Sequence, residues 1–451
     1  MPEVAPLYQR YRWVDMFAGK GDLIFPLLEL TPPAERADFY REHIFLYDIQ
    51  PEMVECCVQR AIQLGIPEPL ARQNIRQQDT LATYPTEILK SSIPVCHITN
   101  PPYLYLGYIV KQPETQPYQK YFEGFNKGYQ DLYQIALMND LRHGVPYMIY
   151  IIPSNFLFGF SNANKIRDDF LPFYKIQKAI VFEKGLFEHT GVHVSLCFFE
   201  RKAEPVREPQ QFEGLKINDR TRRRLYYLSP AFHYRAGSEF EEFTRRYRAN
   251  CPLKVGYYLY YETVKSHYGD LPIQVVDANT FTGNGYQQYQ VSVDESLFKK
   301  VRTNPLFLRT LDTGTQDGRA GIYLISEVFG ADAIMVSKAP YRTHPIHLFL
   351  EPTLPYEDVL LLKDYFNLLL EHFRERTDSE FMTTYKYSES LYTRKYLGLS
   401  QAKALIETFP YLDLTPAQRE QLRHIIQTKN VDALLRSLEA HAAGGNLSLW
   451  L

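Results

Sequence analysis

The sequence predicts an α/β fold with an open, mostly parallel sheet in about its first 200 residues, followed by a C-terminal mixed α+β domain. Two observations support this prediction. Short apolar runs alternate with helical stretches from residue 12 to residue 202, a rhythm typical of β-α-β units. This rhythm stops beyond a polar, proline-containing stretch, which indicates a change of domain.

The composition is that of an ordinary globular protein. The 451 residues are 45% hydrophobic and 23% charged, with 50 Lys and Arg against 52 Asp and Glu. A chain of this length buries enough apolar surface to fold without a metal or disulfide. The five cysteines form no CxxC pair, which argues against structural zinc and a secreted scaffold. We see no signal peptide and no run of about 20 apolar residues, so we expect a soluble cytoplasmic protein that binds no membrane.

The elements of the first domain follow from apolar runs and the residues that flank them. Pro51 favours a helix start, because proline suits the first helical turn. We expect strands over 13–17, 43–48, 72–77, 94–99, 146–152, 176–182 and 192–199, and helices from the glycine turn to residue 30 and over 53–64, 118–142 and 164–173. In such a sheet, ligands bind at the carboxyl ends of the strands.

The rest of the chain predicts three further segments. Residues 1–202 form the first domain, 203–214 a linker, 215–400 the second domain, and 401–451 a helical C-terminal segment. Apolar residues at helical spacing predict helices over 356–375 and 416–442. Residues 216–254 hold ten Lys and Arg against four Asp and Glu, a basic block that the near-neutral total charge conceals. Such a block suits a polyanion, although a solvated charged face has the same composition.

A glycine-rich turn follows the first expected strand. Gly19 and Gly21 lie in DMFAGKG (15–21), and Asp48 ends the next strand about 30 residues later. This pattern is typical of nucleotide-binding turns, in which glycines admit a ligand to the backbone and a carboxylate accepts ribose hydroxyls. The third glycine of the dinucleotide fingerprint is replaced by Ile24, so no pyrophosphate clamp is expected.

A second motif, Asn100-Pro101-Pro102-Tyr103, follows the strand expected at 94–99. The prolines remove two backbone donors, so an asparagine oxygen and a proline carbonyl form a double acceptor. That pair suits an exocyclic NH₂ group, and Tyr103 offers a flat face to a planar ring. The alternative is a proline turn that only caps a strand.

Together these motifs resemble the DNA adenine-N6 methyltransferases of type II restriction-modification systems, in the class whose target-recognition domain follows the catalytic domain. DMFAGKG, YDIQPEM (47–53), RQQDTL (76–81) and ITNPPY (98–103) are similar to its first four motifs, in order. YMIYIIPSNFLFG (147–159) and VFEKGLFEHTGVHVSLCFF (181–199) are similar to its last two. The family carries a further cofactor segment upstream, of which Pro2–Ala5 is at most a remnant.

The resemblance implies a Rossmann-like seven-stranded sheet that binds S-adenosylmethionine and releases S-adenosylhomocysteine. The resemblance implies that Asp15 and Phe17 lie along the methionine part of the cofactor, and that Gly19 and Gly21 let it approach the backbone. Asp48 would hold the ribose, and Ile49, Asp79 and Thr80 would lie around the adenine. Asn100 is implied to border the cofactor as well. The implied contacts to the target adenine come from Asn100 and the Pro101 carbonyl to its amine, and from Tyr103 and Phe187 to its faces.

The resemblance also implies the partners. We expect a monomer that binds double-stranded DNA in a bacterial cytoplasm, needs no metal, and works with a separately encoded restriction endonuclease. The expected DNA-binding residues are Arg222, Arg223, Arg224, Arg245 and Arg246. Two alternatives stay open: a methyltransferase of RNA or of protein glutamine that shares NPPY, and a DNA-binding specificity subunit without catalysis. His97 is expected to be a core histidine, and His189 and His193 to be solvated.

Overall fold

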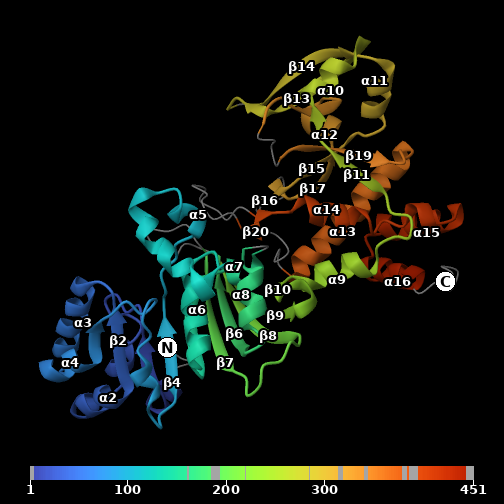
Figure 1. Ribbon diagram of the computed structural model, residues 1–451. Coiled ribbons are helices and arrows are strands. Elements are labelled where there is room, and N and C mark those ends of the chain that lie inside the picture. Colours follow the sequence, from blue (N-terminus) through green and yellow to red (C-terminus); the bar gives the residue numbers. More distant parts are fainter. Residues whose placement is uncertain are drawn as a thin grey trace. The chain divides into compact units, whose positions relative to one another are not determined.

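The computed structural model describes residues 5–159, 162–183, 193–218, 220–283, 285–312, 318–339, 344–377, 383–384 and 395–442. The chain divides into two compact units, Met1–Ala236 and Gly237–Leu451. Figure 1 shows the helices and strands of both units.

The first unit is built on a ten-stranded sheet with the order β10-β9-β8-β6-β7-β5-β4-β1-β2-β3. Strands β1 to β5 are parallel to one another, whereas β7 is antiparallel to both of its neighbours, β5 and β6. This arrangement confirms the predicted α/β fold with a mostly parallel sheet. The strands are β1 Arg12–Asp15, β2 Ile44–Asp48, β3 Ile75–Gln77, β4 Val95–Thr99, β5 Tyr147–Pro153, β6 Tyr174–Phe182, β7 Val194–Arg201, β8 Gln210–Ile217, β9 Thr221–Ser229 and β10 Arg235–Ala236.

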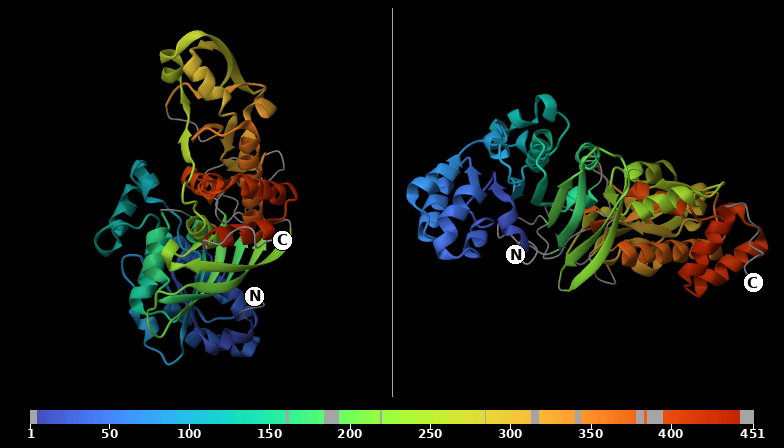
Figure 2. Two further views of the ribbon diagram at one scale, coloured as in Figure 1. Left: turned by 90° about the vertical axis from the view of Figure 1, so that its right-hand side faces the viewer. Right: turned by 90° about the horizontal axis from the view of Figure 1, so that it is seen from below.

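The sheet is wider than the expected seven strands, and this corrects the predicted domain boundary. β8 pairs in parallel with β6, and β9 pairs antiparallel with β8 (Figure 2). The segment 203–214 is therefore a linker only in its proline-containing first part, and the first unit ends at Ala236 rather than at residue 202. The prolines indicated a break correctly, but the chain after them returns to the same sheet.

The helices of the first unit are α1 Phe25–Glu29, α2 Arg36–His43, α3 Pro51–Gln63, α4 Glu68–Asn74, α5 Leu106–Ile109, α6 Leu132–His143, α7 Asn155–Phe158 and α8 Asn164–Phe170. The short 3₁₀ helices are η1 Ala5–Arg10, η2 Pro33–Glu35, η3 Thr86–Leu89, η4 Pro113–Phe122, η5 Gly124–Asn126 and η6 Pro230–Phe232. Two predicted elements are wrong in part. The strand expected at 72–77 begins only at Ile75, because α4 occupies the preceding residues. The helix expected over 118–142 is interrupted, because Gly124 and Gly128 adopt positive φ angles of 58° and 99°.

The sheet carries a hydrophobic core on each face. Neighbouring residues of β1 alternate between the two cores, Trp13 in one and Val14 in the other, as the two-residue period of a strand requires. Both are almost fully buried, at 2% and 0% exposed. Helices on both faces are what a parallel sheet needs to bury its apolar strands.

The described residues of the second unit form three sheets together with helices. The sheet orders are β11-β19-β15-β17, β12-β18-β13-β14 and β16-β21-β20. The strands are β11 Lys254–Tyr257, β12 Leu259–Tyr260, β13 Tyr268–Phe281, β14 Tyr286–Val293, β15 Leu306–Arg309, β16 Leu311–Asp312, β17 Gly321–Leu324, β18 Ala333–Val336, β19 Ile346–Glu351, β20 Thr383–Thr384 and β21 Lys395–Tyr396. The helices are α9 Ser238–Arg246, α10 Tyr261–Ser266, α11 Glu295–Arg302, α12 Ile325–Phe329, α13 Tyr356–Thr377, α14 Leu399–Ile406, η8 Tyr411–Asp413, α15 Pro416–Gln427 and α16 Val431–Ala442.

The helix expected over 416–442 is thus two helices, separated by Lys429 at a φ of 53°. Within the described part of the chain, no helix is both long and apolar enough to cross a membrane.

Candidate active site

The ends of three neighbouring strands bring the predicted residues to one edge of the sheet. Asp15 is the last residue of β1, Asp48 is the last residue of β2, and Asn100 directly follows β4. β1 lies between β2 and β4, and both pairings are parallel. Parallel strands end at the same edge, so these polar residues of distant sequence position become neighbours.

The glycine turn is fastened to the end of β2. The Gly19 N–H donates to Asp48 Oδ2 at 2.8 Å, and the Gln50 N–H donates to Asp48 Oδ1 at 2.9 Å. Gly19 and Gly21 have φ angles of 52° and 76°, which residues with a side chain rarely adopt. A β-carbon on Gly21 would lie 2.3 Å from the Phe25 ring, so the turn requires glycine there.

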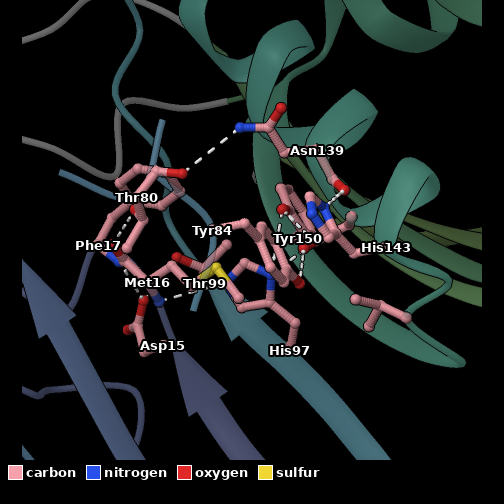
Figure 3. Close-up of polar contacts among 12 residues, drawn as sticks. Asp15, Met16, Phe17, Thr80, Tyr84, His97, Thr99, Asn139, His143 and Tyr150 are labelled. Atoms are coloured by element: carbon pink, nitrogen blue, oxygen red, sulfur yellow. Dashed lines mark hydrogen bonds and ion pairs between the residues drawn. The ribbon is translucent and has the colours of Figure 1, made fainter. Parts of the chain in front are cut away.

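Asp15 is buried beneath this turn, with 1% of its surface exposed. Its Oδ1 accepts hydrogen bonds from the Phe17 N–H at 3.0 Å and from Thr99 Oγ1 at 2.6 Å. Burial raises the pKa of the Asp15 carboxyl to about 6, because the charged form loses hydration that these two donors only partly replace. Thr80, also predicted, donates its hydroxyl to the Met16 carbonyl at 2.9 Å (Figure 3).

Asp79 has partners that the sequence did not indicate. Tyr121 of η4 donates its hydroxyl to Asp79 Oδ2 at 2.6 Å, and the Ala82 N–H donates to Oδ1 at 3.1 Å. Lys120 Nζ lies 3.7 Å from the same carboxylate. Burial and the neighbouring carboxylate raise the pKa of Tyr121, which keeps its hydroxyl protonated as a donor. Beside β2, Ile49 is half exposed, which leaves an apolar surface at the predicted adenine position.

The Asn100 motif contains a contact that sequence reasoning missed. The Tyr103 hydroxyl lies 2.5 Å from Asn100 Oδ1 and 2.7 Å from the Ile151 carbonyl of β5. We expected Tyr103 to act through its ring face, yet its hydroxyl also orients the amide that was predicted to bind the target. Pro101 is buried beside it. Phe187 and His189 lie outside the described residues, whereas the His193 carbonyl accepts from the Ser154 N–H at 2.8 Å.

The basic block divides between the two units. Arg222, Arg223 and Arg224 lie on β9 of the first unit, where Arg222 and Arg223 are exposed and Arg224 is half-buried. β6 and β5 both run antiparallel to β7, and β8 runs parallel to β6. The turn from β8 to β9 therefore lies at the same sheet edge as Asn100. The placement of these three arginines in the second domain was wrong.

The other two predicted DNA-binding residues lie on α9 of the second unit. Arg245 and Arg246 are both exposed there. Arg246 forms an ion pair with Glu439 of α16, so part of its charge is compensated within its own unit. Among the described residues, no group of three or more His, Cys, Asp or Glu side chains is placed to hold a metal ion.

Comparison with known proteins gives a family match for part of the chain. Residues 42–224 match the family model of N-6 DNA methylases. The matched region contains Asp48, Asp79 and the Asn100–Tyr103 motif, and it confirms for this region the resemblance seen in the motifs. No curated protein sequence matches the chain.

Several solved structures are similar at low sequence identity. A modification subunit of a putative type I restriction enzyme from Vibrio vulnificus YJ016 is 13% identical over 70% of this chain and 56% of its own, with a TM-score of 0.35. A type I restriction-modification methyltransferase subunit from Streptococcus thermophilus is 16% identical over 48% and 45%, with a TM-score of 0.33. The type IIG restriction endonuclease BpuSI is 11% identical over 94% and 59%, with a TM-score of 0.40. The chain thus spans less than two thirds of each of these proteins.

Proposed function

We propose that this chain is an S-adenosylmethionine-dependent DNA methyltransferase that methylates N6 of an adenine flipped out of duplex DNA. The observation that supports this most is the position of Asn100 and Pro101. They follow β4 at the edge where Asp15 and Asp48 end the neighbouring strands. Asn100, Pro101 and Asp48 lie within residues 42–224, which match the N-6 DNA methylases. An acceptor pair for an exocyclic amine thus lies beside a nucleotide-type turn.

The residues at the glycine turn fit S-adenosylmethionine. A β-carbon on Gly19 would meet no atom within 4 Å, so the backbone there is open to a ligand. Asp48 is oriented by two backbone N–H groups and keeps further lone pairs for ribose hydroxyls. Ile49 offers its apolar surface to an adenine ring. When bound, this cofactor supplies a methyl group attached to a positively charged sulfur, and that sulfur becomes a neutral thioether once the methyl group is transferred.

The chain's own residues prepare the target amine. Asn100 Oδ1 and the Pro101 carbonyl accept its two hydrogens, which favours tetrahedral geometry and withdraws the nitrogen lone pair from the ring. The Tyr103 hydroxyl holds the Asn100 amide in this orientation. Transfer is then an in-line displacement, in which the nitrogen–methyl bond forms as the sulfur–methyl bond breaks, and the methylated nitrogen then releases one proton to water. Correct positioning of the two reactants contributes most of the acceleration. Flipping the base out of the stack costs about a few kcal/mol, which contacts to the DNA must offset.

The basic hairpin of β8 and β9 favours nucleic acid over protein as the substrate. Five strand spacings separate β9 from β4 in the sheet order. At about 4.8 Å for each spacing, the exposed arginines lie roughly 24 Å along the edge from Asn100. That span corresponds to about seven base pairs of duplex, so a flipped adenine at Asn100 would leave flanking phosphates within reach of Arg222 and Arg223.

The resemblance supports a wider setting for this activity. We expect the second unit to select the target sequence, and a separately encoded endonuclease of a restriction-modification system to cut unmodified DNA. The monomeric state of the chain stays a prediction.

A transfer assay tests the proposed function against its alternatives. The purified chain with methyl-labelled S-adenosylmethionine is offered duplex DNA, RNA and a mixed protein fraction in parallel. We expect label in DNA as N6-methyladenine. Label in RNA or in protein glutamine would contradict the proposal, as would a chain that binds DNA but not the cofactor, which fits a specificity subunit.

A further inference from the structure

A buried hydrogen-bonded chain links helix α6 to the backbone of the glycine turn (Figure 3). His97 of β4 places its Nδ1 2.5 Å from Asp140 Oδ2 of α6. On the other side of the ring, the Met16 N–H donates to His97 Nε2 at 3.3 Å. Asp140 and His97 are 1% exposed and Met16 is 2% exposed. This series of hydrogen bonds therefore ends, out of contact with water, on the peptide group that links Asp15 to Met16.

The chemistry of the groups fixes the direction of this chain. A backbone N–H can only donate, so His97 Nε2 must present its lone pair to Met16. The ring proton is then on Nδ1, where it donates to Asp140. Tyr150 and Tyr84 donate their hydroxyls to the same carboxylate at 2.5 and 2.8 Å. Burial raises the pKa of both tyrosines, which keeps these donors protonated. Together, the Met16 N–H on one side and the Asp140 carboxylate on the other fix the orientation of the His97 ring, with its proton on Nδ1.

Both backbone polar groups of Met16 form hydrogen bonds to side chains. Its N–H is held by His97, and its carbonyl accepts from Thr80 Oγ1 at 2.9 Å. Two residues after His97, on the same strand, Thr99 holds the Asp15 carboxylate at 2.6 Å. The next residue is Asn100. One strand thus fixes the cofactor turn with two side chains and then supplies the acceptor for the target amine.

We propose that His97, oriented by Asp140, is a positioning residue that sets the backbone conformation of Asp15–Phe17 and so the affinity for S-adenosylmethionine. The inference rests on the proposed function, because it concerns the cofactor of that reaction. The simpler expectation was a core histidine whose hydrogen bonds are satisfied but which does not act on the cofactor site. The two roles predict different responses to substitution.

Two isosteric substitutions separate these roles. The amide of His97→Gln reaches the position of Nε2, where its oxygen can accept from the Met16 N–H. The shorter amide of His97→Asn reaches only the position of Nδ1, where it can donate to Asp140 but leaves Met16 without an acceptor. Both variants lose the ring, so each is the other's control for lost aromaticity.

Calorimetry with S-adenosylmethionine and hydrogen exchange of the peptide over residues 12–18 supply the readouts. We expect His97→Asn to raise the Kd about tenfold, the effect of one lost hydrogen bond. It should also speed exchange of the Met16 amide. His97→Gln should stay within about threefold of wild type in affinity, since it keeps that bond.

The outcomes that overturn the inference differ from those that overturn the proposed function. Equal affinities and equal Met16 exchange in the two variants would leave His97 a packing residue, even if both variants melt at lower temperature. A wild-type chain that binds no S-adenosylmethionine would overturn both proposals. A wild-type chain that binds the cofactor, with unequal variants, but methylates no DNA would overturn only the proposed substrate.

Discussion

The two ends of the ten-stranded sheet hold their polar groups in different ways. At the end formed by β1, β2 and β4, Asp15 and Asp48 are only 1% and 8% exposed, and backbone N–H groups fix both carboxylates. At the β8–β9 hairpin, Arg222 and Arg223 are exposed. The first arrangement suits one small ligand in one pose, because its groups are preorganised and partly desolvated. The second suits a polyanion of any sequence, because exposed charges adapt and act through a screened field.

Because Asp15 is buried, we expect its ionised carboxylate to destabilise the folded protein at pH values above its folded pKa of about 6. Asp15→Asn removes the charge, while the amide oxygen keeps both hydrogen bonds that Oδ1 accepts. The folded pKa of about 6 lies above the ordinary aspartate pKa of 3.8, so the folded state binds the proton more tightly. Wild type should therefore gain stability relative to the variant as pH falls from about 6 to about 4, by up to about 3 kcal/mol.

Urea unfolding of both proteins between pH 4 and pH 8 measures this difference. Glu52→Gln, at an exposed acidic residue of α3, controls for charge removal alone. A stability difference between Asp15→Asn and wild type that is constant over this range would show that the Asp15 charge is not penalised by burial.

Removing the carboxylate that fastens the glycine turn should weaken cofactor binding. Asp48→Ala loses the acceptor of both the Gly19 and the Gln50 N–H groups as well as the proposed ribose contact. We expect the Kd for S-adenosylmethionine to rise on the order of 10- to 100-fold, since two hydrogen bonds are at stake. Calorimetry checks it, with Glu29→Ala, at an exposed acidic residue of α1 outside the motifs, as the control. Equal affinity in wild type and Asp48→Ala would remove Asp48 from the site.

The smallest effect is expected at the exposed end of the sheet. Arg223→Ala should weaken binding to cognate and random duplexes alike and lower the slope of log K against log salt by about 0.9, the share of one phosphate contact. Lys175→Ala removes an equal charge from an exposed position at the start of β6, at the opposite sheet edge. If both variants show the same salt slope, the hairpin is only a solvated face.

The same contrast explains what the sequence could predict. The motifs around Asp15, Asp48 and Asn100 were interpretable because parallel strands end at one edge, so position along the chain determines position in space. The partners Tyr121, Lys120 and the Tyr103 hydroxyl were missed, because they depend on how irregular segments fold back over that edge. No local sequence pattern predicts such contacts.

The domain boundary failed for a related reason. Pro205 and Pro209 correctly indicated a break in the regular secondary structure. Whether the next strand joins the sheet of the first unit depends on pairing between β6 and β8, and the prolines carry no information about that pairing. His97 was recognised as buried, yet its burial alone did not reveal that Met16 and Asp140 bind opposite sides of its ring.

Modification-sensitive long-read sequencing of DNA from cells that produce this chain tests the central claim most directly. The proposed mechanism predicts N6-methyladenine at one fixed sequence with the wild-type chain. It predicts none above background with Asn100→Ala, since losing one amine acceptor should slow transfer on the order of 100-fold or more. Tyr103→Phe, which keeps the ring and loses only the hydroxyl bonded to Asn100, should give partial modification. Two results would contradict the proposed mechanism: no N6-methyladenine in DNA from cells that produce the wild-type chain, or equal N6-methyladenine in DNA from cells that produce the wild-type and the Asn100→Ala chains.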